Sequence, residues 1–249
     1  MSAHACSGAS ELTESSEAAT AHTVELARRM AQHSLGQRAV VDYIEDWLAE
    51  PQALFDRLLA EQTWEQHSTV AVRPDGTRRE VPQGRLMAWA GEIPYTYSGL
   101  TLEPRPLAGP LAELTDRLNA ELSAGFNHVV LNLYRDGHDH VGRHADCETQ
   151  LGYEPLIASL SLGAERRFVI EPKAKGRRWR KTLANGSLLV MSGSLQHRFR
   201  HSLPRQPSVA EPRINVTWRR MLGPPGMSRS DPSRRGTPRA VREETPEIP

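Results

Sequence analysis

Three residues of this chain have the types and the order of a metal-binding triad. His144 and Asp146 are separated by one residue, and His201 follows much later in the sequence. Because alternate side chains of an extended strand point to the same face, His144 and Asp146 can approach one ion from the same side. Two histidines and one carboxylate hold non-haem Fe(II) and leave coordination positions open. The sequence therefore predicts an iron site here.

Other histidines compete for this role. His197 lies four residues before His201, so on a strand it would face the same way and line the site without binding the ion. His140 could pair with His144 on a helix, but two nearby glycines argue against a helix there. Since the chain has 10 histidines, a His-x-Asp motif arises easily by chance. The motif needs support from other residues.

That support comes from alternating polar residues near the end of the sequence. On a strand, one face would carry Arg213, Asn215, Thr217 and Arg219. Unpaired charge is costly in a core, so two inward-facing arginines require an anionic partner. Arginine binds carboxylates through paired hydrogen bonds, and 2-oxoglutarate has two carboxylates. We assign these four residues to such a co-substrate; the alternative is the solvated outer face of an edge strand.

Asn132 and Tyr134 also alternate onto one face of an expected strand, together with Val130. An asparagine amide and a tyrosine hydroxyl are suitable hydrogen-bond donors to a carboxylate. We assign both residues to the co-substrate site. The alternative is a polar pair that is satisfied within the sheet near the end of the strand.

The elements that must position these residues change in type along the chain. Residues 36–62 favour two helices interrupted at Pro51, because apolar residues recur at spacings of three and four. Residues 110–124 favour a longer amphipathic helix. Residues 69–81 are typical of a hairpin around a Pro-Asp-Gly turn. The helices precede most of the residues that could do chemistry.

Short segments rich in branched and aromatic residues then predict strands at 127–134, 156–162, 166–171, 187–191 and 214–219. Helices followed by many short strands indicate an α+β fold. We expect N-terminal helices that support a double-stranded β-helix, or jelly roll. Such a barrel would bring the two histidines, the carboxylate and the arginines to its inside.

The two ends of the chain look unable to join this core. Residues 1–35 begin with a Ser-, Ala- and Glu-rich segment, and residues 223–249 are rich in Pro, Arg and Ser. We expect a disordered leader, one domain at 36–222 and a disordered tail. There is no secretory signal or membrane-crossing apolar run, and Cys6 and Cys147 do not suggest a disulfide. These features predict a cytoplasmic monomer with no membrane partner.

Together the motifs resemble the AlkB family of Fe(II)- and 2-oxoglutarate-dependent nucleic-acid dealkylases. The resemblance runs from about Met87 to Arg220, with Trp218 where the family often has Phe. It rests on Asn-x-Tyr at 132–134, His-x-Asp at 144–146, His201 before Ser-Leu-Pro, and Arg-x-Asn-x-Thr-x-Arg at 213–219. The resemblance implies that iron binds the two histidines and Asp146, and that 2-oxoglutarate is anchored by Asn132, Tyr134, Arg213 and Arg219.

The resemblance also implies a reaction. O2 and 2-oxoglutarate are consumed, a methyl group on a base nitrogen of DNA or RNA is oxidised, and formaldehyde, succinate and CO2 are released. The biological role would be the repair of alkylation damage. A base inside a duplex cannot reach such a pocket, so it must be flipped out or already single-stranded.

Two further stretches resemble the branch of the family that repairs DNA and RNA. In the first, Tyr95 and Tyr97 are implied to approach the extruded base, where aromatic faces stack at a gain of about 1–3 kcal/mol each. In the second, Glu148 matches an acidic residue near the base, whereas Cys147 replaces a second acidic residue that relatives commonly carry. Aromatic core filling is the alternative for either tyrosine.

Basic residues also gather at 166–181, where they could neutralise phosphates or form a solvated hairpin. Two other functions stay open. An oxygenase of this type could act on a protein or a small molecule, although the basic run, Tyr95 and Tyr97 argue against it. A non-catalytic nucleic-acid-binding barrel is the other, although the intact triad and arginines argue against that.

Overall fold

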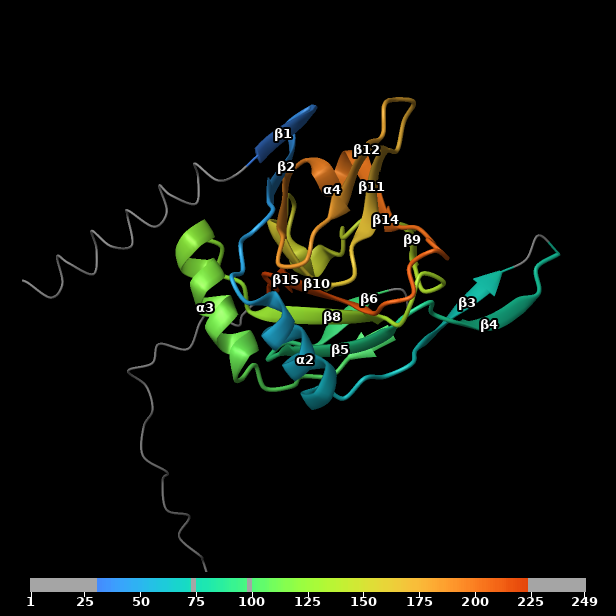
Figure 1. The fold of residues 1–249 in the computed structure, drawn as a ribbon. Coiled ribbons are helices and arrows are strands. Elements are labelled where there is room, and N and C mark those ends of the chain that lie inside the picture. The colour runs from blue at the N-terminus through green and yellow to red at the C-terminus, as the bar shows by residue number, and fades with distance from the viewer. Residues whose placement is uncertain (1–30, 73–74, 98–99, 224–249) are drawn as a thin grey trace, which may run out of the picture.

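The computed structural model describes residues 31–72, 75–97 and 100–223 (Figure 1). The predicted tail lies outside these ranges apart from Gly223, and of the predicted leader only residues 31–35 are described. Those five residues belong to strand β1 (Ala31–Gly36), which pairs with β2. No helix within the described ranges is long and apolar enough to cross a membrane.

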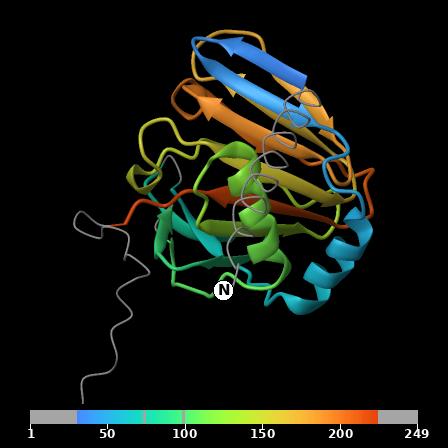
Figure 2. The same ribbon diagram turned by 90° about the vertical axis from the view of Figure 1, so that its left-hand side faces the viewer.

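Two antiparallel sheets form the body of the protein and confirm the predicted jelly roll (Figures 1 and 2). The larger sheet has the strand order β1-β2-β13-β10-β15-β8-β5. Its other strands are β2 (Ala39–Ile44), β13 (Leu188–Gly193), β10 (Ile157–Gly163), β15 (Arg213–Arg219), β8 (His128–Tyr134) and β5 (Leu86–Gly91). Strand β15 lies near the centre, which places its side chains far from both sheet edges.

The smaller sheet has the order β12-β11-β14-β9 and consists of β12 (Trp179–Leu183), β11 (Arg166–Pro172), β14 (Phe199–Leu203) and β9 (Val141–His144). Two ribbons add to the sheets. The predicted hairpin is present as β3 (Ser68–Val72) and β4 (Arg78–Pro82), and it extends away from the body (Figure 1). The second ribbon pairs β6 (Tyr95–Tyr97) with β7 (Leu100–Leu102).

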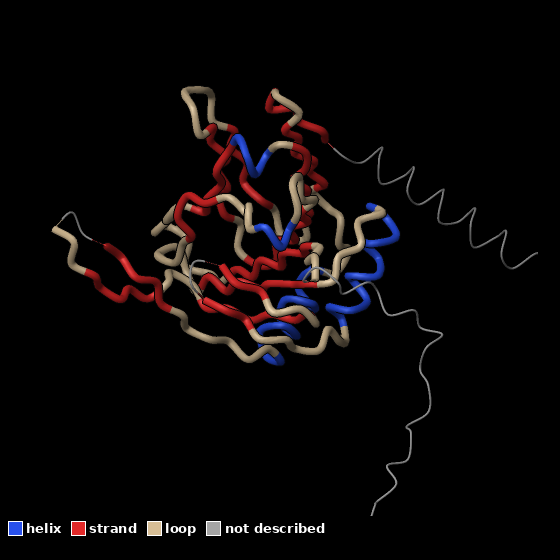
Figure 3. Tube along the Cα trace, turned by 180° about the vertical axis from the view of Figure 1, so that it is seen from behind, coloured by secondary structure: helices blue, strands red, loops and turns tan. Residues whose placement is uncertain are grey.

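The longer helices pack against the outside of the larger sheet, as the views from the side and from behind show (Figures 2 and 3). They are α2 (Pro51–Glu61) and α3 (Pro110–Leu122), both of which begin at a proline whose missing N–H costs nothing in the first turn. Two short helices, η1 (Thr149–Leu151) and α4 (Leu195–Arg198), interrupt the strands. Helices α2 and α3 confirm two of the three helical segments expected from the sequence.

The third expectation, a helix that includes Val41, Tyr43 and Ile44, was wrong, because residues 39–44 form strand β2. This strand lies between β1 and β13, and nearly all of its side chains are buried. Val41 and Tyr43 pack into the core between the sheets, whereas Ile44 packs into the core under the helices. A strand buried on both faces reads as a continuous apolar run, which imitates helical spacing.

Strand β15 shows how the fold separates apolar from polar side chains. Ile214, Val216 and Trp218 face the helices and belong to the core beneath them. The indole Nε1 of Trp218 donates a hydrogen bond of 2.8 Å to Thr115 Oγ1 on α3, which fixes the helix to the sheet. The alternate residues of β15 consequently face the smaller sheet, where the candidate site lies.

Candidate active site

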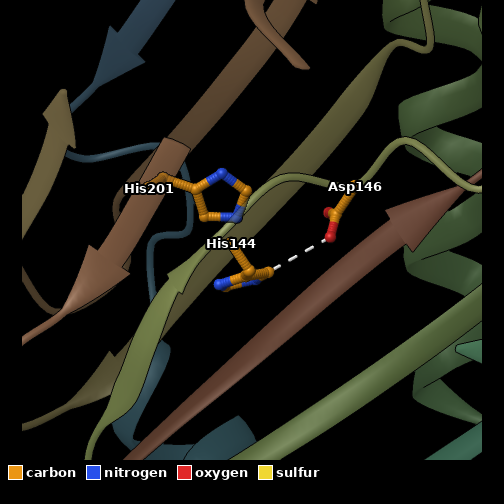
Figure 4. Close-up of side chains that lie close together, drawn as sticks. All are labelled: His144, Asp146 and His201. Atoms are coloured by element: carbon orange, nitrogen blue, oxygen red, sulfur yellow. Dashed lines mark ion pairs between the residues drawn. The ribbon is translucent and has the colours of Figure 1, made fainter. Parts of the chain in front are cut away.

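His144, Asp146 and His201 meet where β9 pairs with β14 (Figure 4). His144 lies directly opposite His201 in this pairing, and their ring centroids are 4.2 Å apart. One possible ligand atom from each of the three residues lies within 4.8 Å of the others. Figure 4 shows the side chains converging from two strands and the loop that follows β9. This arrangement offers three ligands on one side of an ion and leaves its other side open.

Hydrogen bonds orient the side chains of His144 and Asp146 through the atoms that would not bind the ion. His144 Nδ1 lies 2.9 Å from the carbonyl oxygen of Gly142, so Nδ1 carries the proton and Nε2 is free to bind a cation. Asp146 Oδ2 accepts hydrogen bonds from Arg219 Nη2 at 2.8 Å and Nε at 3.2 Å. Asp146 Oδ1, 3.8 Å from His144 Nε2, is left for the ion. The backbone N–H of Asp146 donates to Gln196 Oε1 at 3.0 Å.

The charge states of the group suit a metal. Burial opposes ionisation of Asp146, but Arg219, His201 and His144 together outweigh it and hold the pKa of that carboxyl well below its usual range. Burial, assisted by positive neighbours, lowers the pKa of His201 to about 3. Metal ligands must be deprotonated, and both residues are in that form at neutral pH.

The predicted co-substrate residues line a cavity of about 690 Å³ between the two sheets. All six are on its wall: Asn132, Tyr134, Arg213, Asn215, Thr217 and Arg219. They come from β8 and β15, which are neighbours in the larger sheet, with Arg213 directly opposite Tyr134. His144, Asp146 and His201, which we call the metal group, line the same cavity. The predicted metal site and the predicted co-substrate site therefore share one space.

Arg213 has the features of an anion-binding residue. It is 2% exposed, and no ion pair within the described ranges involves it. Its Nη2 donates to Ser161 Oγ at 2.8 Å, while Nε is buried without a hydrogen-bond partner. Burial lowers the pKa of Arg213 to about 10, so it remains charged at neutral pH. A buried, unpaired guanidinium at a cavity wall fits a carboxylate of 2-oxoglutarate.

Asn215 and Thr217 are already engaged within the sheet. Asn215 Nδ2 donates to Ser159 Oγ at 2.8 Å and to the carbonyl oxygen of Leu160 at 3.1 Å. Thr217 Oγ1 donates to Asn215 Oδ1 at 3.0 Å. Because both amide hydrogens and the hydroxyl hydrogen are used, these two residues support the cavity floor and offer it no further donor.

Arg85 is a cavity residue that we did not predict from the sequence. Its Nε donates to Asn132 Oδ1 at 2.5 Å, so Arg85 occupies the oxygen of that amide. The amide nitrogen of Asn132 is thereby left to donate elsewhere. A single arginine just before β5 carries no periodic signal, and its contact with Asn132 depends on the pairing of β5 with β8.

The residues predicted to meet the base lie on one side of the cavity. Tyr95 and Glu148 both line it, and their side chains interact with each other. The Tyr95 ring is 3% exposed and meets the His128 ring edge-on, with 5.2 Å between centroids. Cys147 is exposed. The side chain of Tyr97 lies outside the described atoms, although its backbone belongs to β6.

Two sequence interpretations, on His197 and Arg166, need correction here, whereas the argument against His140 as a ligand is confirmed. His197 is on helix α4, not on a strand, and its ring lies against that of Tyr153, with 4.6 Å between centroids. His140 lines the cavity but accepts a hydrogen bond of 3.3 Å from Arg205 Nε and does not join the metal group. Arg166, counted in the basic run, is completely buried and donates to the backbone carbonyls of Asp136, Asp139 and Pro204.

Comparison with known proteins places this geometry in a family. A family model described as the 2OG-Fe(II) oxygenase superfamily matches residues 40–219. The chain belongs to this superfamily. It is 38% identical over 188 residues to the alkB homolog 3 dioxygenase of Bos taurus, a match that covers 72% of this chain and 64% of the relative. The human alkB homolog 3 is 37% identical over 190 residues, with 72% and 63% covered.

A third relative, which this chain covers to a larger extent, also places the chain in the AlkB family. The DNA oxidative demethylase ALKBH2 of Mus musculus is 36% identical over 182 residues, which cover 70% of this chain and 76% of the relative. By contrast, the chain spans slightly less than two thirds of the alkB homolog 3 relatives. The solved structure of OsALKBH1 shares the fold, with a TM-score of 0.53 and 14% identity over 76% of this chain and 99% of that chain.

Proposed function

We propose that this protein oxidatively demethylates N-alkylated bases in DNA or RNA, using Fe(II), 2-oxoglutarate and O2, and that it acts as a monomer. The observation that carries the proposal is the shared cavity, which has His144, Asp146 and His201 at one place and the unpaired Arg213 at another. An ion and a dicarboxylate bound there would share one cavity. The names of its relatives, which include a DNA oxidative demethylase, support a nucleic-acid substrate.

The three ligand residues would hold iron, and Arg213 would bind a carboxylate of 2-oxoglutarate. Bound together, the iron and the co-substrate supply the oxidising chemistry. The chain's own groups supply position. Arg219 helps to keep Asp146 ionised and holds one of its oxygens, so the other oxygen would be available to the ion. Arg85 holds the amide oxygen of Asn132, which would leave the amide nitrogen to donate to the co-substrate.

The target base would enter beside Tyr95, Tyr97 and Glu148. Burial raises the pKa of Glu148, so this carboxyl is a weaker acid than an exposed glutamate. Glu148 and Tyr95 line the cavity together, so they would offer a polar edge that a base can meet. Cys147 at the neighbouring position supplies no carboxylate, so we assign the acidic contact with the base to Glu148 alone.

The test is repair of oligonucleotides that carry a methyl group on a base nitrogen. With Fe(II) and 2-oxoglutarate present, we expect the unmethylated base and formaldehyde to form, as measured by mass spectrometry. His144→Ala removes a ligand and abolishes the reaction, while the matched change His33→Ala, in exposed strand β1, leaves it intact. Absence of repair in a metal-loaded protein contradicts the proposal. Turnover driven only by a small molecule or a peptide favours the other oxygenase function.

A non-catalytic barrel gives a different pattern in the same experiment. It would bind oligonucleotides without repair, and His144→Ala would leave that binding nearly unchanged. Comparison of methylated DNA with methylated RNA, each as single and double strands, assigns the preferred substrate.

A further inference from the structure

The smaller sheet has a second, outward face that the proposed reaction does not use. Its inner face carries His201 and Ile170, which lie opposite each other in the pairing of β14 with β11. On the outer face, Val169 lies opposite Arg180 of β12 on one side and Ser202 of β14 on the other. This row forms the floor of a groove on the outside of the protein.

Arginines dominate this groove, which we call the arginine groove. Its basic residues are Arg143, Arg167, Arg178, Arg180 and Arg205, drawn from three strands and two adjoining loops. The one carboxylate in its lining, Glu171, pairs with Arg143 at 3.0 Å and Arg178 at 2.9 Å. Among the described residues, Arg167 and Arg180 take part in no ion pair. The groove therefore has a large excess of positive charge.

The arginine groove continues into the rim of the catalytic cavity. Residues 140–143 and Arg205 line both spaces. On β9, Arg143 is directed to the groove while the next residue, His144, belongs to the metal group. A polymer that placed one unit in the cavity would therefore have its neighbouring units beside the groove.

We propose that the arginine groove binds the phosphodiester backbone of the nucleic-acid strand whose base occupies the cavity. The inference rests on the proposed function, because that function supplies the base. Lysine and arginine side chains that neutralise phosphates give affinity without reading sequence. The exposed, unpaired arginines and the small apolar floor suit a hydrated polyanion better than the apolar core of a protein interface. Glu171 lies between Arg143 and Arg178, and its single negative charge neutralises only part of the positive charge of the five arginines.

The test variant is Arg167→Gln/Arg180→Gln. Both residues are exposed and lie outside the catalytic cavity, so the fold does not depend on their charges. Arg167→Lys/Arg180→Lys keeps the charge at the same places. The matched control is Arg38→Gln/Arg57→Gln, which removes two exposed arginines from a strand turn and from helix α2.

The measurement is binding of an unmethylated single-stranded oligonucleotide, followed by fluorescence anisotropy over a range of salt concentrations. Each phosphate neutralised contributes about 0.7 to the slope of log affinity against log salt concentration, so the glutamine variant should lose about 1.4 from that slope. The lysine variant and the control should retain the wild-type slope. An unchanged slope in the glutamine variant overturns the proposal, as does equally tight binding of polyglutamate in the wild type.

This experiment requires no turnover, so it separates the groove from the reaction. If the wild type repairs no methylated base but the glutamine variant loses slope, the proposed function fails and the arginine groove stands. If repair occurs and the slope is unchanged, only the groove fails.

Discussion

The arginines inside the cavity and those in the arginine groove are in opposite physical states. Arg213 and Arg219 are buried, one without an ion-pair partner and the other bound to Asp146. Arg167 and Arg180 are exposed to solvent on the far face of the smaller sheet. A buried charge is stable only with a partner, so each inner arginine predicts a specific anion. A solvated arginine needs no ion-pair partner for stability, because water solvates its charge. Several such residues can therefore attract a polyanion through their summed charge.

This difference predicts that substitutions in the cavity change stability or co-substrate binding strongly, whereas substitutions in the arginine groove have small, salt-dependent effects on oligonucleotide binding. The largest is expected for Asp146→Asn. It removes a metal ligand and the partner of Arg219, so the metal-free protein should lose about 3–5 kcal/mol of unfolding free energy. Urea unfolding measures this loss, and Mn(II) titration should show loss of binding at the site. Retained Mn(II) affinity would contradict the assignment of Asp146 as a ligand.

Arg213→Met should separate activity from stability. Loss of one partner of a buried charge pair costs about 2 kcal/mol or more, so the KM for 2-oxoglutarate should rise roughly thirty-fold. The unfolding free energy of the protein without co-substrate should not fall, since a buried unpaired charge is removed. Steady-state kinetics and urea unfolding check the two halves. A loss of stability as large as that of Asp146→Asn would show that Arg213 is structural.

A smaller effect is expected for Arg85→Met. The amide of Asn132 loses its oxygen partner, so its nitrogen is no longer held toward the co-substrate, and the KM for 2-oxoglutarate should rise several-fold, equivalent to about 1 kcal/mol. Because Arg85 acts through Asn132, adding Arg85→Met to Asn132→Ala should have little further effect. Additive losses in this double-mutant cycle would instead indicate direct contact with the co-substrate. Mn(II) affinity should not change in either variant.

The smallest effect concerns the groove. Glu171→Gln releases two exposed arginines from their pairing, so oligonucleotide binding should tighten and depend more steeply on salt. The unfolding free energy should fall by no more than about 1 kcal/mol, because the two arginines of these ion pairs are largely exposed although Glu171 is not. Glu154→Gln, which releases Arg38 elsewhere on the surface, is the matched control. Weaker oligonucleotide binding by Glu171→Gln would count against the groove.

The sequence predicted most of the inner face because strand periodicity carries that information. Alternation along 213–219 put Arg213 on the polar face and Trp218 on the apolar one, and the fold agrees. Periodicity failed at residues 39–44, where a strand covered on both faces imitates a helix. The pairing of β2 with β13, far along the chain, decides that strand, and no local pattern reports it.

Contacts between distant residues were beyond sequence reasoning. Arg219 was assigned to the co-substrate, yet its guanidinium lies against Asp146, 73 positions away. The hydrogen bond from Arg85 to Asn132 and the joining of Arg143 and Arg205 into one groove depend on strand pairing in the same way. Residue types and spacing identify a candidate site, whereas hydrogen-bond partners within it come from the fold.

The central claim is that one cavity couples the consumption of 2-oxoglutarate to demethylation of a base. The most direct test measures succinate and formaldehyde together, with and without a methylated oligonucleotide. The account predicts equal amounts of the two products with the methylated strand, little succinate with the unmethylated strand, and neither product from Asp146→Asn. Succinate that forms at the same rate on both strands, without formaldehyde, would contradict it.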